Sequence, residues 1–224
     1  MNYAFITGAS KGIGRAIAIE LAQRKNNLLL TARSEDLLKG LAADIQREYE
    51  VTVQFKACDL TDPEVPAQLA EWCKSNKYDV NILVNNAGFG LWGTFGELPV
   101  EGQLEMMNLN MNALVALTHH FLPILSNSKP SYIMNVASLA SFLAIPHFSI
   151  YAATKAFVLS FSRSLRFDVA KKGVAVSCLC PGATESEFLQ RAGMEAVGDK
   201  AKGVYMSAET VAKIAVNGMM RGKA

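Results

Sequence analysis

The sequence predicts an α/β protein in which helices cover both faces of one doubly wound parallel sheet. Apolar runs of strand length recur along the 224 residues, and a segment of helical length separates each run from the next. Half of the residues are hydrophobic and 19% are charged, which suits strands buried on both faces. We expect a single domain over residues 1–224. The six predicted strands are Tyr3–Thr7, Asn27–Thr31, Val51–Ala57, Val80–Asn85, Ser131–Ala137 and Val174–Leu179.

The composition argues against several classes of function. A net charge of +2 indicates neither a nucleic-acid surface nor a membrane patch, and no apolar run is long enough to span a bilayer. The chain enters its first strand at Tyr3 without the zones of a signal peptide. Cys58, Cys73, Cys178 and Cys180 form no Cys-x-x-Cys pair and the histidines have no ligand-like company, so no metal site is expected. We expect reduced thiols in a cytoplasmic protein.

Local signals support the helices between the strands. Ser34 can cap a helix whose first turn is acidic. Further helices are expected from near Ile13, over residues 149–171 and over Ser207–Met220.

A glycine-rich segment, Thr7–Gly14, lies between the first strand and the first helix. Glycines there allow a tight turn, and they let backbone N–H groups and the helix N-terminus approach a pyrophosphate. The spacing is three residues and then one, unlike the general G-x-G-x-x-G fingerprint, and a merely tight turn is the alternative. The segment predicts a Rossmann-type dinucleotide site. Its candidate cofactor contacts are Gly8, Ser10, Lys11, Gly12, Ile13 and Gly14.

Arg33 follows the second strand, where an acidic residue would bind the ribose of NAD. A guanidinium at this place can hold a 2′-phosphate, and Lys11 adds a second positive charge. We therefore expect NADP(H) to be preferred over NAD(H). The alternative is that Arg33 pairs locally with Glu35 or Asp36 while Lys11 is solvated.

The third and fourth strands also end in candidate cofactor contacts. Asp59, next to Leu60, can accept a hydrogen bond from the adenine amino group or can instead cap its own turn. Asn86, Ala87 and Gly88 follow the fourth strand, where amides can hold the ligand crevice open. A plain turn is the alternative there.

Ser138 follows the fifth strand, and Tyr151 lies thirteen positions further on. If residues 149–171 are helical, Tyr151 and Lys155 lie on one face, so that a phenol and an ammonium share a small space. This arrangement can move a proton. Taken alone, the spacing favours an ordinary surface pair, and the other motifs of the chain decide between the two interpretations.

Together these motifs resemble those of the short-chain dehydrogenase/reductase family of the single-domain type, over Tyr3 to about Phe188. The resemblance implies that Asn110 is the family's helix asparagine. It also implies that a segment after the sixth strand contacts the nicotinamide end of the cofactor. The contacts there would come from Pro181, Gly182, Thr184 and Ser186, the last standing where threonine is usual.

The resemblance also bears on assembly. Members commonly have a seventh strand, whereas this chain stops just after the predicted helix Ser207–Met220, so we expect six strands or a shortened form. It implies a homodimer or homotetramer through helices that start near Leu109 and Ser149. Phe157 and Phe161 are candidate contacts, with ordinary core packing as the alternative.

The implied function is the NADPH-dependent reduction of a ketone or aldehyde to an alcohol, or the reverse oxidation. Tyr151 would supply the proton and Ser138 a second hydrogen bond. An ammonium ~4 Å from the phenol is worth roughly 4 kcal/mol before desolvation, enough to lower the tyrosine pKa by about three units, so Lys155 would activate Tyr151. Asn110 would hold a relay water.

A catalytically silent dinucleotide-binding protein, acting as a sensor or an assembly subunit, is the alternative function. It would have no use for Asn110, Ser138, Tyr151 and Lys155 together.

The substrate is a small molecule whose pocket is predicted from apolar segments. Candidate walls are Leu139–His147, Phe89, Trp92 and a glycine-containing lid over Ala183–Tyr205. Their apolar character favours an apolar carbonyl compound.

Overall fold

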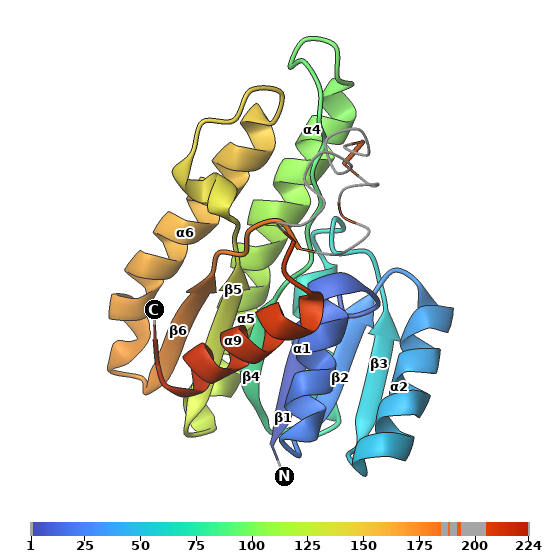
Figure 1. Ribbon diagram of the computed structural model, residues 1–224. Helices are drawn as coiled ribbons and strands as arrows, with labels where there is room; N and C mark the ends of the chain where they lie inside the picture. Colours follow the sequence, from blue (N-terminus) through green and yellow to red (C-terminus); the bar gives the residue numbers. More distant parts are fainter. Residues whose placement is uncertain (1, 185–187, 189–191, 194–204, 224) are drawn as a thin grey trace.

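The computed structural model describes residues 2–184, 188, 192–193 and 205–223 (Figure 1). Its parallel sheet has six strands in the order β3-β2-β1-β4-β5-β6, which confirms the predicted doubly wound fold. Five of the six strands begin at the expected residue, and β3 begins two residues later. The strands are β1 Tyr3–Thr7, β2 Asn27–Ala32, β3 Val53–Ala57, β4 Val80–Asn85, β5 Ser131–Val136 and β6 Val174–Leu179.

Helices cover both faces of the sheet, as expected. On one face α1, α2 and α9 pack on the strands, and α3, α5 and α6 pack on the other. Figure 1 shows α1 and α9 in front of the sheet. The helices are α1 Gly12–Gln23, α2 Glu35–Tyr49, α3 Val65–Ser75, α4 Val100–Met107, α5 Leu114–Asn127, α6 Ser149–Ala170 and α9 Ala208–Met220.

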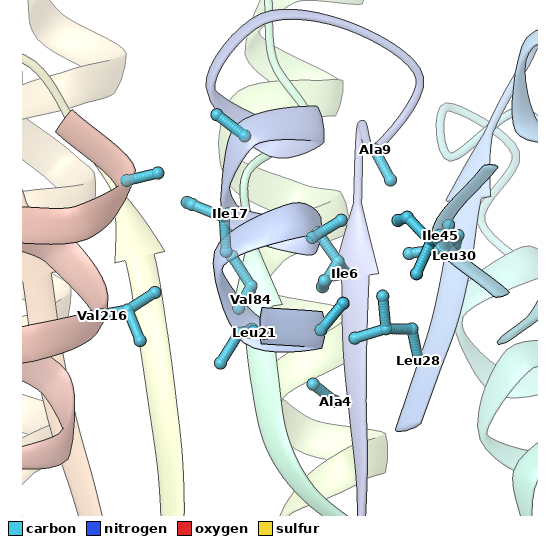
Figure 2. Close-up of a cluster of buried hydrophobic side chains, with 14 of the residues drawn as sticks. Ala4, Ile6, Ala9, Ile17, Leu21, Leu28, Leu30, Ile45, Val84 and Val216 are labelled. Carbon is cyan, nitrogen blue, oxygen red and sulfur yellow. The ribbon is translucent and has the colours of Figure 1, made fainter. Parts of the chain in front are cut away.

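The strand side chains alternate between two hydrophobic clusters, because successive residues of a strand face opposite sides of a sheet. Ile6 and Leu28 point to the face that α1, α2 and α9 cover, whereas Phe5 points to the other face, where its ring lies 4.6 Å from that of Phe121. Figure 2 shows the first cluster, in which Val216 of α9 lies beside Ile17 and Leu21 of α1. At the carboxyl ends of the strands, loops rather than these two clusters surround the sheet.

The strand order reverses at β1, which pairs with β2 on one side and with β4 on the other. Loops that leave β1 and β4 therefore diverge to opposite faces and open a crevice between them. Ligands of open α/β sheets bind at such a point. The fold thus brings the glycine loop after β1 beside the segment after β4.

The helix that we expected to start near Leu109 begins earlier, at Val100. Helix α4 runs into a π-helical turn, Asn108–Ala113, and then into α5 without leaving the helical region of backbone angles. A single π turn inside an α-helix inserts one residue and re-aims its neighbours, and such turns are frequent at functional sites. The turn contains Asn110.

The other predicted helix ends agree closely with the structure. Helix α6 covers the expected residues apart from Lys171, and the Ser207 side chain caps α9 by accepting a hydrogen bond from Thr210 N at 3.2 Å. Ser34 precedes α2 as its N-cap residue, although its side chain makes no capping bond. Among the described residues, no helix is long and apolar enough to cross a membrane.

Candidate active site

A cavity of about 490 Å³ opens at the carboxyl ends of the strands and brings most of the candidate residues together. Gly14 and Asn110 lie behind its wall, and Ser186 falls outside the described residues. The sequence-predicted residues that line the cavity are Gly8, Ser10, Lys11, Gly12, Ile13, Arg33, Asp59, Leu60, Asn86, Ala87, Gly88, Ser138, Tyr151, Lys155, Pro181, Gly182 and Thr184.

The glycine loop has a backbone that other residues fit poorly. Gly8 and Gly12 have φ angles of 63° and 54°, and a Cβ on Gly14 would lie 2.3 Å from Gly8 O. Asn86 fixes the loop from the neighbouring strand, because its Nδ2 donates to Thr7 O at 2.9 Å and to Gly8 O at 3.1 Å. The Asn86 amide therefore bonds to the backbone of the glycine loop.

Arg33 lies on the cavity wall without the local partners that we considered. Within the described residues, no ion pair joins it to Glu35 or Asp36. Asp59 is also on the wall, but its Oδ1 caps its own turn by accepting bonds from Thr61 N at 3.0 Å and Thr61 Oγ1 at 2.8 Å. The bond from the Thr61 backbone, with a smaller contribution from Arg33, lowers the pKa of the Asp59 carboxyl.

Tyr151 and Lys155 are both buried, one turn apart on α6, with relative exposures of 6% and 5%. Lys155 Nζ donates to Val136 O, at the end of β5, at 2.9 Å and lies 5.7 Å from the centroid of the Tyr151 ring. The Ser138 hydroxyl acts to lower the pKa of the phenol, and its Oγ accepts from Ala140 N at 3.1 Å. The three side chains form one cluster at the end of β5.

The direction of the tyrosine shift is opposite to the sequence-based prediction. Burial raises the pKa of Tyr151 to about 12, with the hydrogen bond from Ser138 opposing the rise. Burial also lowers the pKa of Lys155 to about 8. The prediction included the attraction between the Lys155 ammonium and the phenolate but not the cost of desolvation. Desolvation has the larger effect on the pKa values of these two buried groups. At neutral pH Tyr151 is a protonated phenol, which suits a proton donor.

Asn110 joins the loop after β4 to helix α6. Its Oδ1 accepts from Phe89 N at 3.1 Å, and its Nδ2 donates to Phe89 O at 3.0 Å and to Thr154 Oγ1 at 3.1 Å. A Cβ on Gly88 would lie 2.8 Å from Asn110 Oδ1 and 3.4 Å from Lys155 Nζ. Both amide hydrogens of Asn110 are thus used by protein groups, and only acceptor capacity remains for the predicted water.

Aromatic side chains wall the half of the cavity next to Tyr151. The Phe148 ring stacks on Tyr151 at 4.2 Å between centroids, and the Phe188 ring lies 5.3 Å from Tyr151. Phe89, Trp92 and Ile145 also line this half. Phe148 lies one residue beyond the segment that we expected to form the wall and directly precedes α6 as its N-cap residue, so helical periodicity does not reveal its contact with Tyr151.

Parts of the predicted substrate walls lie elsewhere. Within Leu139–His147, the cavity is lined by Leu139, Ala140 and Ile145. The predicted lid lies largely outside the described residues, with Gly198 and Gly203 among those not described.

Comparisons with known proteins agree on one family. A family model described as short chain dehydrogenase matches residues 2–196. An uncharacterized oxidoreductase of Staphylococcus saprophyticus is 33% identical over 183 residues, which cover 82% of this chain and 78% of the relative. A human relative named inactive hydroxysteroid dehydrogenase-like protein 1 is 32% identical over 183 residues, covering 80% of this chain and 55% of that protein.

Solved structures share the fold. The structure of a short-chain dehydrogenase from Sphingobium yanoikuyae in complex with NADPH matches with a TM-score of 0.92 at 33% identity, covering 100% of this chain and 86% of that chain. Other matching structures include complexes with NADP-type cofactors and a complex with NAD. Neighbours of this fold therefore bind nicotinamide dinucleotides.

Replacing Asn110 with alanine should lower the free energy of unfolding by about 2 to 4 kcal/mol, because Phe89 N, Phe89 O and Thr154 Oγ1 lose buried partners. Urea unfolding of the wild type and the variant measures the loss. The matched control is Asn112→Ala, since Asn112 is exposed and its side chain bonds, within the described part of the chain, to Asn108 alone. Similar losses in both variants would contradict this role for Asn110.

Lys155 should make stability depend on pH. Because its folded pKa of about 8 is below that of an unfolded lysine, the folded protein releases a proton first, and its stability rises between about pH 8 and pH 10. Relative to Lys155→Met, the wild type should gain up to about 3 kcal/mol over this range. Tyr151 is present in both proteins, so its own contribution to the pH dependence cancels in the difference. A constant difference in unfolding free energy across the range would contradict the burial of the ammonium.

Proposed function

Because the chain belongs to the short-chain dehydrogenase/reductase family, we propose that it reduces a ketone or aldehyde to an alcohol with NADPH, or catalyses the reverse oxidation. One observation carries the proposal. A single cavity is lined by the glycine loop and Arg33 at one end and by Ser138, Tyr151 and Lys155 at the other. A dinucleotide that spans this cavity would present its nicotinamide beside the phenol.

The residues present fit NADP(H). Gly12 and Ile13, at the N-terminus of α1, line the cavity, so backbone N–H groups of the first helical turn can receive a pyrophosphate. The first turn of α1 carries no acidic residue to repel it. Arg33 would bind the 2′-phosphate, and Lys11 would add positive charge to the same end of the cavity. We therefore propose NADP(H) as the preferred cofactor.

The bound cofactor supplies a hydride, and the protein's own groups manage the developing oxyanion. Tyr151 donates its phenolic proton to the substrate oxygen, while the Ser138 hydroxyl donates a second hydrogen bond to it. As the phenol loses its proton, the Lys155 ammonium 5.7 Å from the ring stabilises the phenolate. Asn110 acts as a positioning residue, because it ties the Phe89 loop to α6.

The substrate is an uncharged apolar carbonyl compound. Phe148, Trp92 and Phe188 supply aromatic surface next to the phenol. Among the described lining residues of this half, Lys155 is the one charged group, and its ammonium is directed to Val136 O. A charged substrate group would lose its hydration there without gaining a partner.

A catalytically silent dinucleotide-binding protein is the second candidate. This candidate is included because one human relative is named as inactive. NADPH oxidation over a panel of ketones, aldehydes, quinones and β-ketoacyl thioesters separates the two. Turnover of any member supports the reductase, whereas NADPH binding without turnover supports the silent protein.

We also propose a homo-oligomeric, single-domain protein of the cytoplasm. Phe157 is 39% exposed on α6 and stacks on Phe161, with the two ring centroids 5.9 Å apart. Phe161 also packs against buried residues, so core packing accounts for part of its role. Phe157 is the better contact for a second copy, and sedimentation analysis at micromolar concentration is the direct test.

Tyr151→Phe should keep NADPH binding and lower turnover by at least about a hundredfold, because it removes the general acid and leaves the ring in place. Steady-state NADPH oxidation and a fluorescence titration with NADPH measure the two effects. Tyr78→Phe serves as a control, since Tyr78 packs against Tyr3 and Trp72 away from the cavity. Turnover within tenfold of the wild type would remove Tyr151 from this role.

Arg33→Asp should shift preference from NADPH toward NADH, because the change deletes a phosphate donor and adds a repelling charge. Arg33→Ala, which deletes the donor alone, should give a smaller shift. The measurement is the ratio of kcat/KM for the two cofactors in each variant. An unaltered ratio in Arg33→Asp would count against phosphate recognition by Arg33.

A further inference from the structure

A second cavity, of about 480 Å³, lies between β6 and α6 and has no part in the proposed reaction. Its wall combines Phe142 and Phe167 with the guanidinium-bearing Arg163 and with two thiols, Cys178 and Cys180. Both thiols are half-buried and line the opening. Small molecules in solvent can therefore reach the sulfurs.

The two thiols face each other. Cys178 lies in β6, Cys180 follows the end of the strand, and residues two apart in extended backbone point the same way. Their Sγ atoms are 4.0 Å apart, close enough for one thiol to bond to the other. The remaining cysteines lack such a neighbour, since the Cys58 sulfur bonds to Thr31 Oγ1 at 2.9 Å and Cys73 is buried in α3.

The surroundings favour a thiolate on Cys180. The bond from Cys178 lowers the pKa of Cys180, and the Arg163 guanidinium, the Ser138 backbone N–H and the Lys155 ammonium act in the same direction. The same thiol–thiol bond, together with burial, raises the pKa of Cys178. Burial alone raises the pKa of Cys73 to about 12. Since the thiolate is the nucleophile, Cys180 is the more reactive of the pair.

We propose that Cys178 and Cys180 form a reversible dithiol–disulfide couple, in which Cys180 reacts first with a hydroperoxide and Cys178 then resolves the product. In the first step the Cys180 sulfur attacks one peroxide oxygen, an S–O bond forms, the O–O bond breaks, and the leaving oxygen takes up a proton. In the second step Cys178 attacks the sulfenic sulfur, an S–S bond forms, and water leaves. Two thiols and hydrogen peroxide become one disulfide and two waters. A thiol reductant reverses the change.

Closing this bond would act on the candidate active site. The sulfurs, now 4.0 Å apart, must move closer together, which shifts Cys180 and the backbone that follows it. The next residue, Pro181, accepts from Leu139 N at 2.9 Å, so the same movement pulls on the segment that carries Ser138. Lower turnover in the oxidised protein is therefore expected, a consequence that rests on the proposed function.

The test uses the full chain treated with hydrogen peroxide, then with iodoacetamide, and digested with trypsin. Both cysteines lie in one tryptic peptide, residues 173–191. This peptide should lose two hydrogens, resist alkylation, and regain both thiols after dithiothreitol, while Cys58 and Cys73 stay alkylatable once the protein is unfolded. In Cys178→Ser, a 1,3-dione should label Cys180 as its sulfenic acid, and in Cys180→Ser it should leave Cys178 unlabelled.

Full alkylation of both cysteines after peroxide, or a disulfide that joins two chains, would overturn the couple. Dione labelling of Cys178 in the Cys180→Ser variant would overturn the order of reaction. These mass measurements need no turnover, so they are independent of the proposed reductase activity. In an active protein, unchanged NADPH oxidation after disulfide formation would overturn the link to Ser138.

Discussion

The hydrogen bond from Lys155 Nζ to the carbonyl of Val136 joins helix α6 to the end of strand β5, and the candidate active site depends on it. A buried ammonium is costly unless it is bonded, so this contact fixes where the middle of α6 lies against the sheet. Tyr151 is one turn away on the same helix, and Ser138 is two residues beyond Val136. One contact therefore sets the distance between the phenol and the groups that assist it.

The sheet topology supplies the other half of the site. Because β1 pairs with both β2 and β4, the glycine loop and the segment after β4 meet at one edge. Thr7 Oγ1 accepts from Asn86 N and Ala87 N, both at 3.0 Å, and so locks the two segments together. The end of the cavity at the glycine loop is thus held by backbone geometry, whereas the end at Tyr151 and Lys155 is held by buried polar side chains. In the proposed reaction, loosening the first end would weaken cofactor binding, and loosening the second would misplace the proposed proton donor.

Much of this arrangement could be predicted from the sequence, because its causes are local. Apolar runs set the strands, and the glycines and Arg33 follow directly from a strand end. The rest depends on packing between distant segments. The start of α4 at Val100, the π turn around Asn110 and the stacking of Phe148 on Tyr151 leave no simple periodic signal. The predicted direction of the Tyr151 pKa shift was wrong for the same reason, because the extent of desolvation depends on how the assembled core encloses the phenol.

If the phenol and the glycine loop serve one hydride transfer, the hydride must move from the cofactor to the carbonyl carbon. NADPH that carries deuterium on the nicotinamide C4 position from which the hydride leaves, mixed with the protein and a panel of apolar ketones and aldehydes, follows this transfer. The expected product is an alcohol with deuterium on the former carbonyl carbon. NADPH binding without an alcohol product, or an alcohol without deuterium at that carbon, would contradict it.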